Sequence, residues 1–441
     1  MNRIILIGNG FDLAHDLKTS YRQFFDDFWQ KIINEYNNRI IRLLNDSFEN
    51  DFLRIPKAAY KFNERFESPK CREFMELLKK ESIEYTFKNN FLKVLSKKFH
   101  LKNWVDIEEE YYELVKEAMV RYKTTRDSKE IEKLNEEFDR IKKELVKFLD
   151  YKTQNIIPVK DFYRLFCDSF HLQDFPYSKE ELLMDFLRDS FNSESHNSNN
   201  TTNYFNKLKD EIFKDRFFIN RNVNTIEDLI ELFKKNDSHK KDFLEGKLRI
   251  YPQRTLLLNF NYTKTEALYS DFSSYIKNKD TSWASDLPFI NFDTIHIHGE
   301  LNNTDNRIIF GYGDEIADEY KEIEKLNNNN FMKNMKSTEY ANTDNYKRLS
   351  AFTDSDYFQI YIFGHSCGIS DRTLLNTLFE HENCLSIKPF YYEYKDAKTE
   401  EVKNNYQEIA INISRNFEKK KAFREKVVNF TYCDPLPQAK K

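Results

Sequence analysis

Histidines are the side chains of this 441-residue chain best suited to acid–base chemistry, and two of them lie two positions apart. His296 and His298 alternate with apolar residues in Thr294–His298 (TIHIH), so both face one side of a predicted strand. Histidine titrates near neutral pH, at about 6.5, and can take a proton from a hydroxyl group or an incoming water. His298, which Gly299 follows, is therefore our first candidate for a catalytic base.

The histidine pair has two other interpretations. Two histidines on one strand face also form hydrogen-bonded core pairs, and their i, i+2 spacing can supply two ligands to a metal ion. The sequence offers no strong third ligand, so we expect no metal. Glu300 either orients His298 or lies in solvent, and both alternatives stay open.

A glycine-containing turn follows the first predicted strand, Ile4–Ile7. Gly8, Asn9 and Gly10 form this turn, where small residues let backbone N–H groups approach a phosphate, as in α/β nucleotide sites. Leu13 stands where a full dinucleotide fingerprint has its third glycine. An ordinary strand–helix turn is therefore the alternative.

Asp12 and Asn261 are polar residues that follow predicted strands. Asp12 either hydrogen-bonds a ribose hydroxyl or caps the next helix. Asn261 comes after the predicted strand Arg254–Phe260, and its amide offers donors and an acceptor together. It can hold a ribose hydroxyl or orient a water, or it can bond its own backbone in a turn.

Ser366 and Asp371 follow the most strongly predicted strand, Tyr357–Phe363, which breaks at Gly364. Serine contacts to phosphate or ribose are the functional interpretation, and a helix N-cap is the alternative for Asp371. The run GHSCG also matches a nucleophile elbow, but His381 lies too close to Asp371 for a normal triad order.

Strands that alternate with helices predict an α/β fold with a mostly parallel sheet of Rossmann-like type. Five polar clusters (GNGFD, NFNYT, HIHGE, GYGD, GHSCGISD) follow predicted strands, and the carboxyl ends of parallel strands share one edge, where ligands bind. We therefore expect these clusters to form one site. The other elements that we predict are the strands Arg307–Gly311, Pro389–Tyr394 and Val427–Tyr432 and the helices Lys264–Tyr275, Asp371–His381 and Glu400–Arg424.

The region between the first turn and Gly246 is charged and helical in pattern, with a polar loop at Asn192–Asn203. Its clearest helix is Glu130–Asp150, where apolar residues recur every three or four positions. We predict a Rossmann-like nucleotide-binding domain from residues 1–20 and 250–441 and an α-helical insertion or lid at 21–249. Asp106 and Glu108, at a helix start, either favour the helix dipole or reach from the lid into the site.

Composition narrows the class of protein. The net charge is -4 with 32% charged residues, which argues against a dedicated nucleic-acid binder. No apolar run reaches the roughly 18 residues of a membrane span, and the N-terminus has no signal-peptide pattern. The five cysteines are scattered, without metal spacing, which favours a reduced, cytoplasmic setting.

The opening RIILIGNGFDLAHDLKTSY, the HIHGE cluster and the GHS…D element resemble the bacteriophage abortive-infection AbiH family. This resemblance covers the chain nearly from end to end. It implies a phage-defence effector with a phage-derived trigger, and the helical insertion is a candidate regulator or homo-oligomer surface.

The order of motifs is also similar, more distantly, to the sirtuin-like NAD-cleaving domains of phage-defence effectors. The matching motifs are Gly8-Asn9-Gly10, Asn261-Tyr262-Thr263, His298-Gly299 and Gly364-His365-Ser366 with Asp371. Thr263 stands where those domains usually have Asp, and Asn9 where a small residue is usual. The resemblance implies NAD as substrate or ligand, with catalytic His298 and Asn261. It assigns nucleotide binding to Gly8, Asn9, Gly10, Asp12, Gly299, Gly364, Ser366 and Asp371.

Three functions follow as hypotheses. The first is hydrolysis of the nicotinamide–ribose bond of NAD or a related nucleotide. The second is a nucleotide-binding sensor that does not hydrolyse its ligand. The third, a toxin acting on nucleic acid, is disfavoured by the near-neutral charge. The chain has nothing like the zinc-binding cysteine module of deacylating sirtuins, which argues against protein deacetylation.

Overall fold

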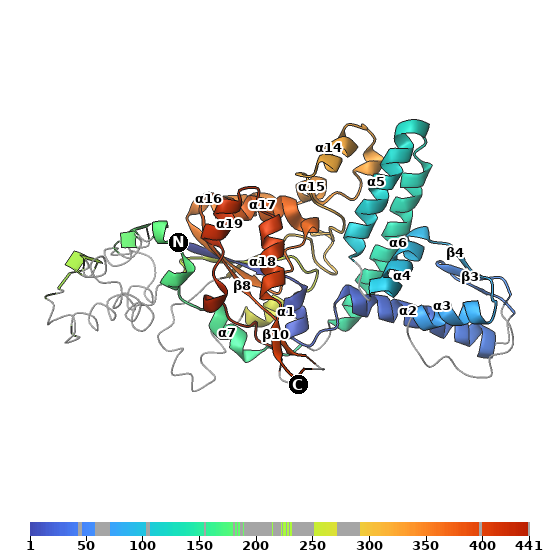
Figure 1. Cartoon of the computed structure of the whole chain (residues 1–441), viewed down its shortest axis with the longest axis horizontal. Coiled ribbons are helices and arrows are strands. Elements are labelled where there is room, and N and C mark those ends of the chain that lie inside the picture. Colours follow the sequence, from blue (N-terminus) through green and yellow to red (C-terminus); the bar gives the residue numbers. More distant parts are fainter. Residues whose placement is uncertain are drawn as a thin grey trace.

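A five-stranded, all-parallel sheet lies at the centre of the protein in a computed structural model (Figure 1). The structure describes residues 1–42, 46–57, 71–102, 106–153, 156–179, 251–270, 292–396 and 399–439, with single residues and pairs of residues between 181 and 231. The strand order is β6-β5-β1-β7-β8, so the N-terminal strand is central. The strands are β1 (Asn2–Ile7), β5 (Thr255–Asn259), β6 (Phe292–His296), β7 (Phe358–Phe363) and β8 (Cys384–Phe390).

The apolar strands are buried on both faces, as parallel strands between helices must be. Ile4 and Leu6 of β1 belong to one hydrophobic cluster, and Ile5 and Ile7 belong to another. The first cluster includes side chains of α16 (Asn345–Ser355), α17 (Arg372–Phe379) and α18 (Tyr406–Arg415), and the second those of α1 (Asn9–Ala14) and α7 (Lys160–Phe166). The predicted α/β class with a parallel sheet is confirmed, whereas its sirtuin-like character stays a prediction.

A second body of helices adjoins the sheet through α1 and α2 (Figure 1). It contains a small antiparallel sheet whose strand order is β2-β3-β4. Its helices are α2 (Tyr21–Asn37), α3 (Cys71–Lys80), α4 (Asn90–Lys102), α5 (Ile107–Thr125) and α6 (Lys129–Lys152), and its strands are β2 (Phe48–Glu49), β3 (Leu53–Ile55) and β4 (Thr86–Phe87).

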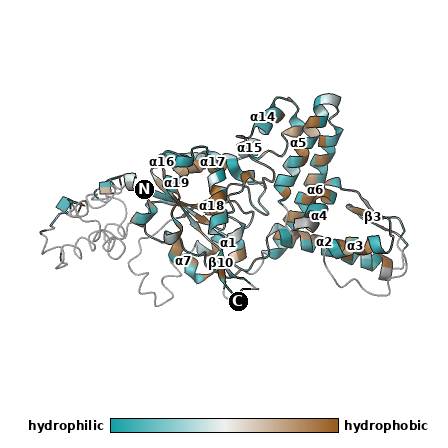
Figure 2. Cartoon of the chain, viewed as in Figure 1, coloured by the Kyte–Doolittle hydropathy of each residue, from teal (hydrophilic) through white to brown (hydrophobic). Residues whose placement is uncertain are grey.

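Helix α6 confirms the helix predicted at Glu130–Asp150, and the predicted apolar stripe is buried. Figure 2 shows hydrophobic and hydrophilic residues alternating along α4, α5 and α6. The helices of this second body share one hydrophobic core. Residues that follow β6 belong to the same core, including Phe310, Tyr312 and Met335. Helices α14 (Asp318–Glu324) and α15 (Lys336–Glu339) belong to this later segment. The division of the chain at residues 20 and 250 stays a prediction.

Several predicted elements are wrong. Arg307–Gly311 is irregular chain rather than a strand, with one main-chain bond from Ile309 to His298 O. Val427 makes only an isolated bridge to Ile387, and the residues after it turn into a 3-10 helix at Phe430–Tyr432. The predicted helix at 400–424 divides into β10 (Val402–Asn404), which pairs with β9 (Glu393–Lys395), then α18 and α19 (Lys420–Lys426).

Two further predictions are partly right. The strand predicted at 389–394 begins earlier, as β8 at Cys384, and Pro389 is tolerated because β8 is an edge strand. The helix predicted at 264–275 is a 3-10 helix at Thr265–Tyr269, and its last residues, like the polar loop predicted at 192–203, lie outside the described residues. In the described part of the chain, no helix is both long enough and apolar enough to cross a membrane.

Candidate active site

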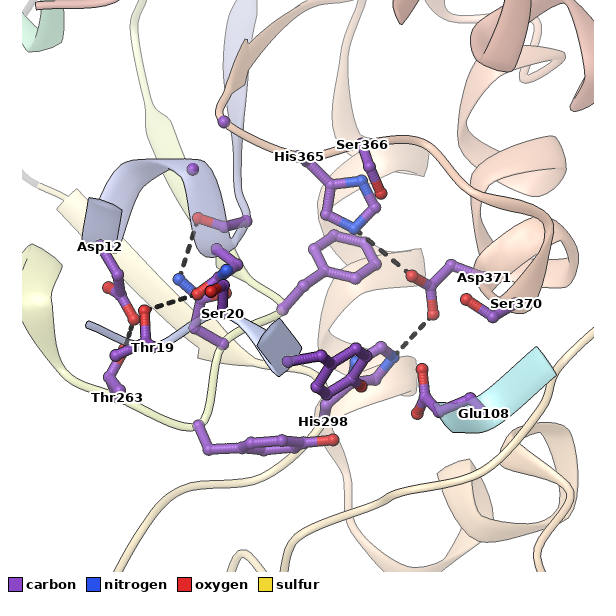
Figure 3. A pocket seen from close by; sticks show the side chains of 18 of the residues that line it. Asp12, Thr19, Ser20, Glu108, Thr263, His298, His365, Ser366, Ser370 and Asp371 are labelled. Atoms are coloured by element: carbon purple, nitrogen blue, oxygen red, sulfur yellow. Dashed lines mark hydrogen bonds and ion pairs between the residues drawn. The ribbon is translucent and has the colours of Figure 1, made fainter. Parts of the chain in front are cut away.

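A cavity of about 310 Å³ opens at the carboxyl edge of the sheet (Figure 3). Residues that directly follow β1, β5 and β7 line it, together with His298, two residues beyond β6. Of the predicted site residues the cavity collects Gly8, Asn9, Gly10, Asp12, Asn261, His298, Gly364, Ser366 and Asp371. The predicted convergence of strand ends is therefore confirmed for four of the five clusters.

The exceptions are Gly299 and the GYGD cluster, which do not line the cavity. Gly299 has a φ of +83° and packs against the main chain of Arg307, where an added Cβ would lie 2.2 Å from the carbonyl oxygen. The positive φ and the close main-chain contact in this turn thus explain why residue 299 is a glycine. The GYGD cluster instead bonds to two residues that line the cavity. Gly311 N donates to Glu108 Oε1, and Tyr312 O accepts from Lys336 N.

The turn after β1 packs directly against the turn after β7. An added Cβ on Gly10 would lie 2.7 Å from Gly364 Cα. Gly10 N donates to Gly364 O at 2.8 Å, and Gly8 N donates to Phe363 O at 3.1 Å. Close packing therefore explains these glycines without a ligand, and their contact with phosphate stays a prediction.

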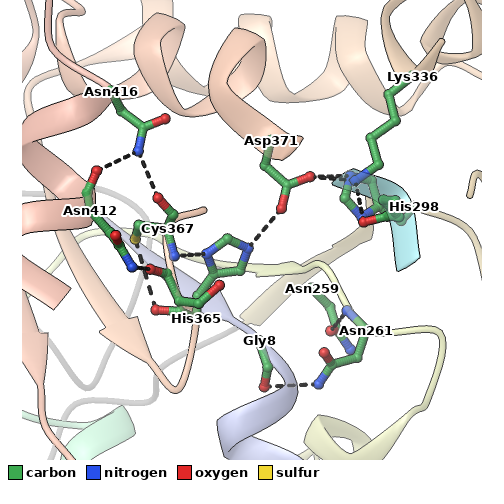
Figure 4. Close-up of polar contacts among 12 residues, drawn as sticks. Gly8, Asn259, Asn261, His298, Lys336, His365, Cys367, Asp371, Asn412 and Asn416 are labelled. Carbon is green, nitrogen blue, oxygen red and sulfur yellow. Dashed lines mark hydrogen bonds and ion pairs between the residues drawn. The ribbon is translucent and has the colours of Figure 1, made fainter. Parts of the chain in front are cut away.

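Asn261 forms part of the cavity wall between β5 and β1 (Figure 4). Its Nδ2 donates to Gly8 O at 3.0 Å, and its main-chain N–H donates to Asn259 Oδ1 at 2.8 Å. Asn259 is fully buried and donates to Thr263 O and Glu266 Oε2, so it supports the turn from behind. The side chain of Asn261 is thus held in one place at the cavity.

Asp371 is the centre of the polar network, with three basic side chains around its carboxylate (Figure 4). Lys336 Nζ lies 2.7 Å and His298 Nε2 3.5 Å from Oδ1, and His365 Nε2 lies 3.4 Å from Oδ2. Asp371 occupies the N-cap position of α17, as the alternative predicted, but its side chain makes no capping bond to the helix. Burial alone would raise the pKa of Asp371, but Lys336, His298 and His365 hold it well below its ordinary value.

His298 is 4% exposed and also lies 3.1 Å from the hydroxyl of Tyr340. Burial and the charge of Lys336 lower the pKa of His298 to about 3, so its imidazole is neutral at neutral pH. A neutral imidazole is the form that accepts a proton, but a pKa this far below neutral makes it a weak base unless a nearby anion stabilises its charged form. The Asp371 carboxylate beside it would stabilise the imidazolium that results.

The other residues of the HIHGE cluster have separate partners. His296 ends β6 and pairs with Glu266 Oε1 at 2.9 Å, away from the cavity. Glu300 pairs with Lys264 at 2.6 Å, and this pairing outweighs burial and lowers the pKa of Glu300 to about 2. Glu300 therefore does not orient His298. In the described part of the chain, no three or more His, Cys, Asp and Glu residues form a group that could hold a metal ion.

Asp12 lies within α1 rather than at the start of a helix, and Ser20 caps α2, so the predicted capping role of Asp12 is wrong. Thr263 Oγ1 donates to Asp12 Oδ2 at 2.7 Å, whereas Oδ1 is buried without a hydrogen-bond partner among the described residues. Burial raises the pKa of Asp12 to about 6.

The helical body contributes to the site through the start of α5. Asp106 caps α5 by accepting from the main chain of Glu108 and Glu109, and Glu108 reaches the cavity. Glu108 Oε2 lies 3.1 Å from Lys336 Nζ. Burial, opposed by Lys336 and reinforced by Asp371, raises the pKa of Glu108. Asp106 lines the cavity as well, so both residues reach the site and Asp106 also caps the helix.

Sequence reasoning missed two residues of the network. His365 stands inside the GHS motif, and its Nδ1 accepts from Cys367 N at 3.0 Å, which places the N–H of a neutral ring on the Nε2 that faces Asp371. The turn is anchored by α18, since Asn412 donates to Ser366 O. Lys336 comes from an Asn-rich segment, and no sequence signal marked it.

Comparison with protein families identifies the family of the chain. The family model for bacteriophage abortive infection AbiH matches residues 4–394, which include the five strands of the sheet, except the first two residues of β1, and all the residues that line the cavity. Searches of curated proteins and of solved structures found no significant match. The chain belongs to the bacteriophage abortive infection AbiH family.

Proposed function

We propose that this AbiH protein binds NAD or a related nucleotide at the strand-edge cavity and hydrolyses its nicotinamide–ribose bond. Family membership gives the chain a role in abortive infection of phage-infected cells. The observation that supports hydrolysis is geometric: His298 Nε2 lies 3.5 Å from Asp371 Oδ1, in a cavity that Asn261 also lines. A volume of about 310 Å³ is at the lower end for small-molecule sites and suits one nucleoside-sized group.

In the proposed reaction the bond between ribose C1′ and the nicotinamide nitrogen breaks, and nicotinamide leaves with the bonding electrons. The ribose becomes oxocarbenium-like, and a water molecule adds to C1′. His298 takes the proton of this water, and Asn261 orients the water or a ribose hydroxyl. Carboxylates around the cavity would stabilise the positive charge on the sugar.

The test is release of nicotinamide from NAD by the purified protein. Loss of the base in His298→Ala should lower the rate by about 10²- to 10⁴-fold. The matched control is His381→Ala, because His381 lies outside the cavity and pairs with the exposed Asp354. Equal rates for the parent and His298→Ala would contradict the proposed role of His298.

A sensor that binds a nucleotide without cleaving it is the second candidate. The low exposure of His298 supports this alternative. A ligand can contact the more exposed lining residues without reaching His298, and it would then bind without being cleaved. NAD that binds to the folded protein and stays intact, with a phage-derived trigger present, would favour the sensor over the hydrolase.

A further inference from the structure

The cavity contains more acidic than basic side chains. Four carboxylates line it, and Lys336 is the one Lys or Arg side chain among the described lining residues. The ammonium of Lys336 is 1% exposed and is already shared between Asp371 and Glu108. It therefore has little capacity left for an anionic ligand. The four carboxylates belong to Asp12, Asp106, Glu108 and Asp371.

Three main-chain donors at the glycine turn are also occupied. Nucleotide sites in α/β proteins hold phosphates mainly through N–H groups of such turns. Here Gly8 N, Gly10 N and Phe11 N donate to Phe363 O, Gly364 O and Gly8 O, at 3.1, 2.8 and 2.9 Å. A phosphate in this cavity would thus face carboxylates without gaining these donors.

Two features of the cavity suit a flat cation instead. Asp12 is 1% exposed, and its Oδ1 is buried without a hydrogen-bond partner among the described residues. The aromatic residues Tyr21, Phe260 and Tyr262 contribute to the lining. An aromatic face attracts a cation, most strongly where water is excluded.

We propose that the cavity selects a positively charged nucleoside group, such as a pyridinium ring joined to ribose, and excludes phosphate groups. This inference rests on the proposed function for its choice of ligand, because the oxidised nicotinamide ring is a pyridinium cation. The phosphates of a dinucleotide would then lie outside the cavity. Glu108 and Asp12 are the residues that determine the preference for charge.

The test compares three probes by isothermal titration: nicotinamide riboside, which is a cation, its neutral reduced form, and nicotinamide mononucleotide, which adds a phosphate. The parent and His298→Ala are titrated side by side, so that hydrolysis during the titration is recognised. We expect the cation to bind at least about tenfold more tightly than the neutral form. The mononucleotide should bind no more tightly than the riboside.

Variants assign the preference to its residues. At pH 9, above the raised pKa of Glu108, Glu108→Gln should reduce the cation preference. Glu113→Gln on the same helix, exposed and paired with Lys116, should keep it. Asp12→Asn is a second variant of nearly the same shape, in case Glu108→Gln destabilises the fold through Lys336. Equal affinity for the cation and the neutral form, tighter binding of the mononucleotide, or no binding of any probe would overturn the inference.

The same samples separate this inference from the proposed function. Nicotinamide release from NAD without a cation preference would overturn the inference alone. A cation preference without release, with the phage-derived trigger present, would overturn hydrolysis alone.

Discussion

At the scale of single residues, Asp371 has the largest electrostatic consequence, because Lys336 is buried beside it. Asp371→Asn should lower the free energy of unfolding by about 3 kcal/mol, since removal of one partner leaves a buried ammonium poorly compensated. Glu108 would compensate only part of that charge. Urea unfolding at pH 7 measures the effect.

The double variant Asp371→Asn with Lys336→Met is the control for this prediction. Removing both charges should recover part of the lost stability, because the methionine needs no counter-charge. A double variant no more stable than Asp371→Asn alone would contradict the electrostatic explanation.

His298 should make the stability of the protein depend on pH. Its pKa is about 3 in the folded state and about 6.5 when unfolded, so the unfolded chain binds the extra proton in between. Its contribution is fully present above pH 6.5 and is lost progressively as the pH falls toward 3. His298→Asn should therefore flatten the fall of unfolding free energy between pH 6.5 and pH 4, compared with His381→Asn. If unfolding free energy changes equally with pH in the two variants, protonation of His298 in the unfolded chain does not cause the loss of stability.

How far the site could be predicted depends on where each residue stands in the sequence. His298, Asn261 and Ser366 lie two or three residues beyond the ends of β6, β5 and β7, and the common edge of a parallel sheet brings such positions together. Lys336 lies 35 positions before Asp371, with which it pairs, in a segment without a clear pattern. Its role depends on tertiary packing, which local pattern does not encode. Glu108 belongs to the helical body. Its position in the cavity depends on how this body packs against the sheet, which the sequence pattern does not show.

At the scale of elements, the turn after β1 and the turn after β7 pack main chain against main chain at the sheet edge. Gly10→Ala would place a Cβ 2.7 Å from both Cα and O of Gly364, and this contact is with main chain that cannot rotate away. We expect a loss of about 1–3 kcal/mol in unfolding free energy. Gly368→Ala is the matched control, because its added Cβ would have only two hydroxyl groups near it, at 3.7 and 3.9 Å.

Equal stability of Gly10→Ala and Gly368→Ala, measured by thermal unfolding, would mean that the turns can separate without cost. It would also weaken the packing explanation of the glycines, and phosphate contact would then become the better reason for them.

Strands of the central sheet were predictable because each is a buried apolar run, and the wrong elements show the limit of that signal. Arg307–Gly311 is equally apolar, but Phe310 packs into the core of the helical body instead of pairing with a strand. Hydrophobicity thus indicated burial without indicating the partner. The helix predicted at 400–424 failed because its polar start pairs with β9 as a hairpin, a contact that period alone does not encode.

At the scale of the whole molecule, the helical body and the segment after β6 share one core. Tyr112 of α5 stacks on Tyr312, with ring centroids 3.9 Å apart. A double-mutant cycle of Tyr112→Ala and Tyr312→Ala should give a coupling energy of about 0.5–1.5 kcal/mol. Chemical unfolding of the four proteins measures it, and strictly additive losses would contradict direct stacking.

This shared core places the helical body where it can affect the site, since α5 carries both Tyr112 and Glu108. A shift of α5 would move Glu108 away from Lys336 and change the charge around Asp371 and His298. The structure thus gives a physical route by which a phage-derived trigger acting on the helices would reach the proposed chemistry.

The cellular content of NAD during phage infection tests the central claim most directly, because any phage-derived trigger is then present. Cells that express the parent protein should lose NAD after infection, whereas cells that express His298→Ala at the same level should keep it. The His381→Ala protein should behave as the parent does. Protection against phage by the parent with unchanged NAD would contradict NAD hydrolysis as the function of this site.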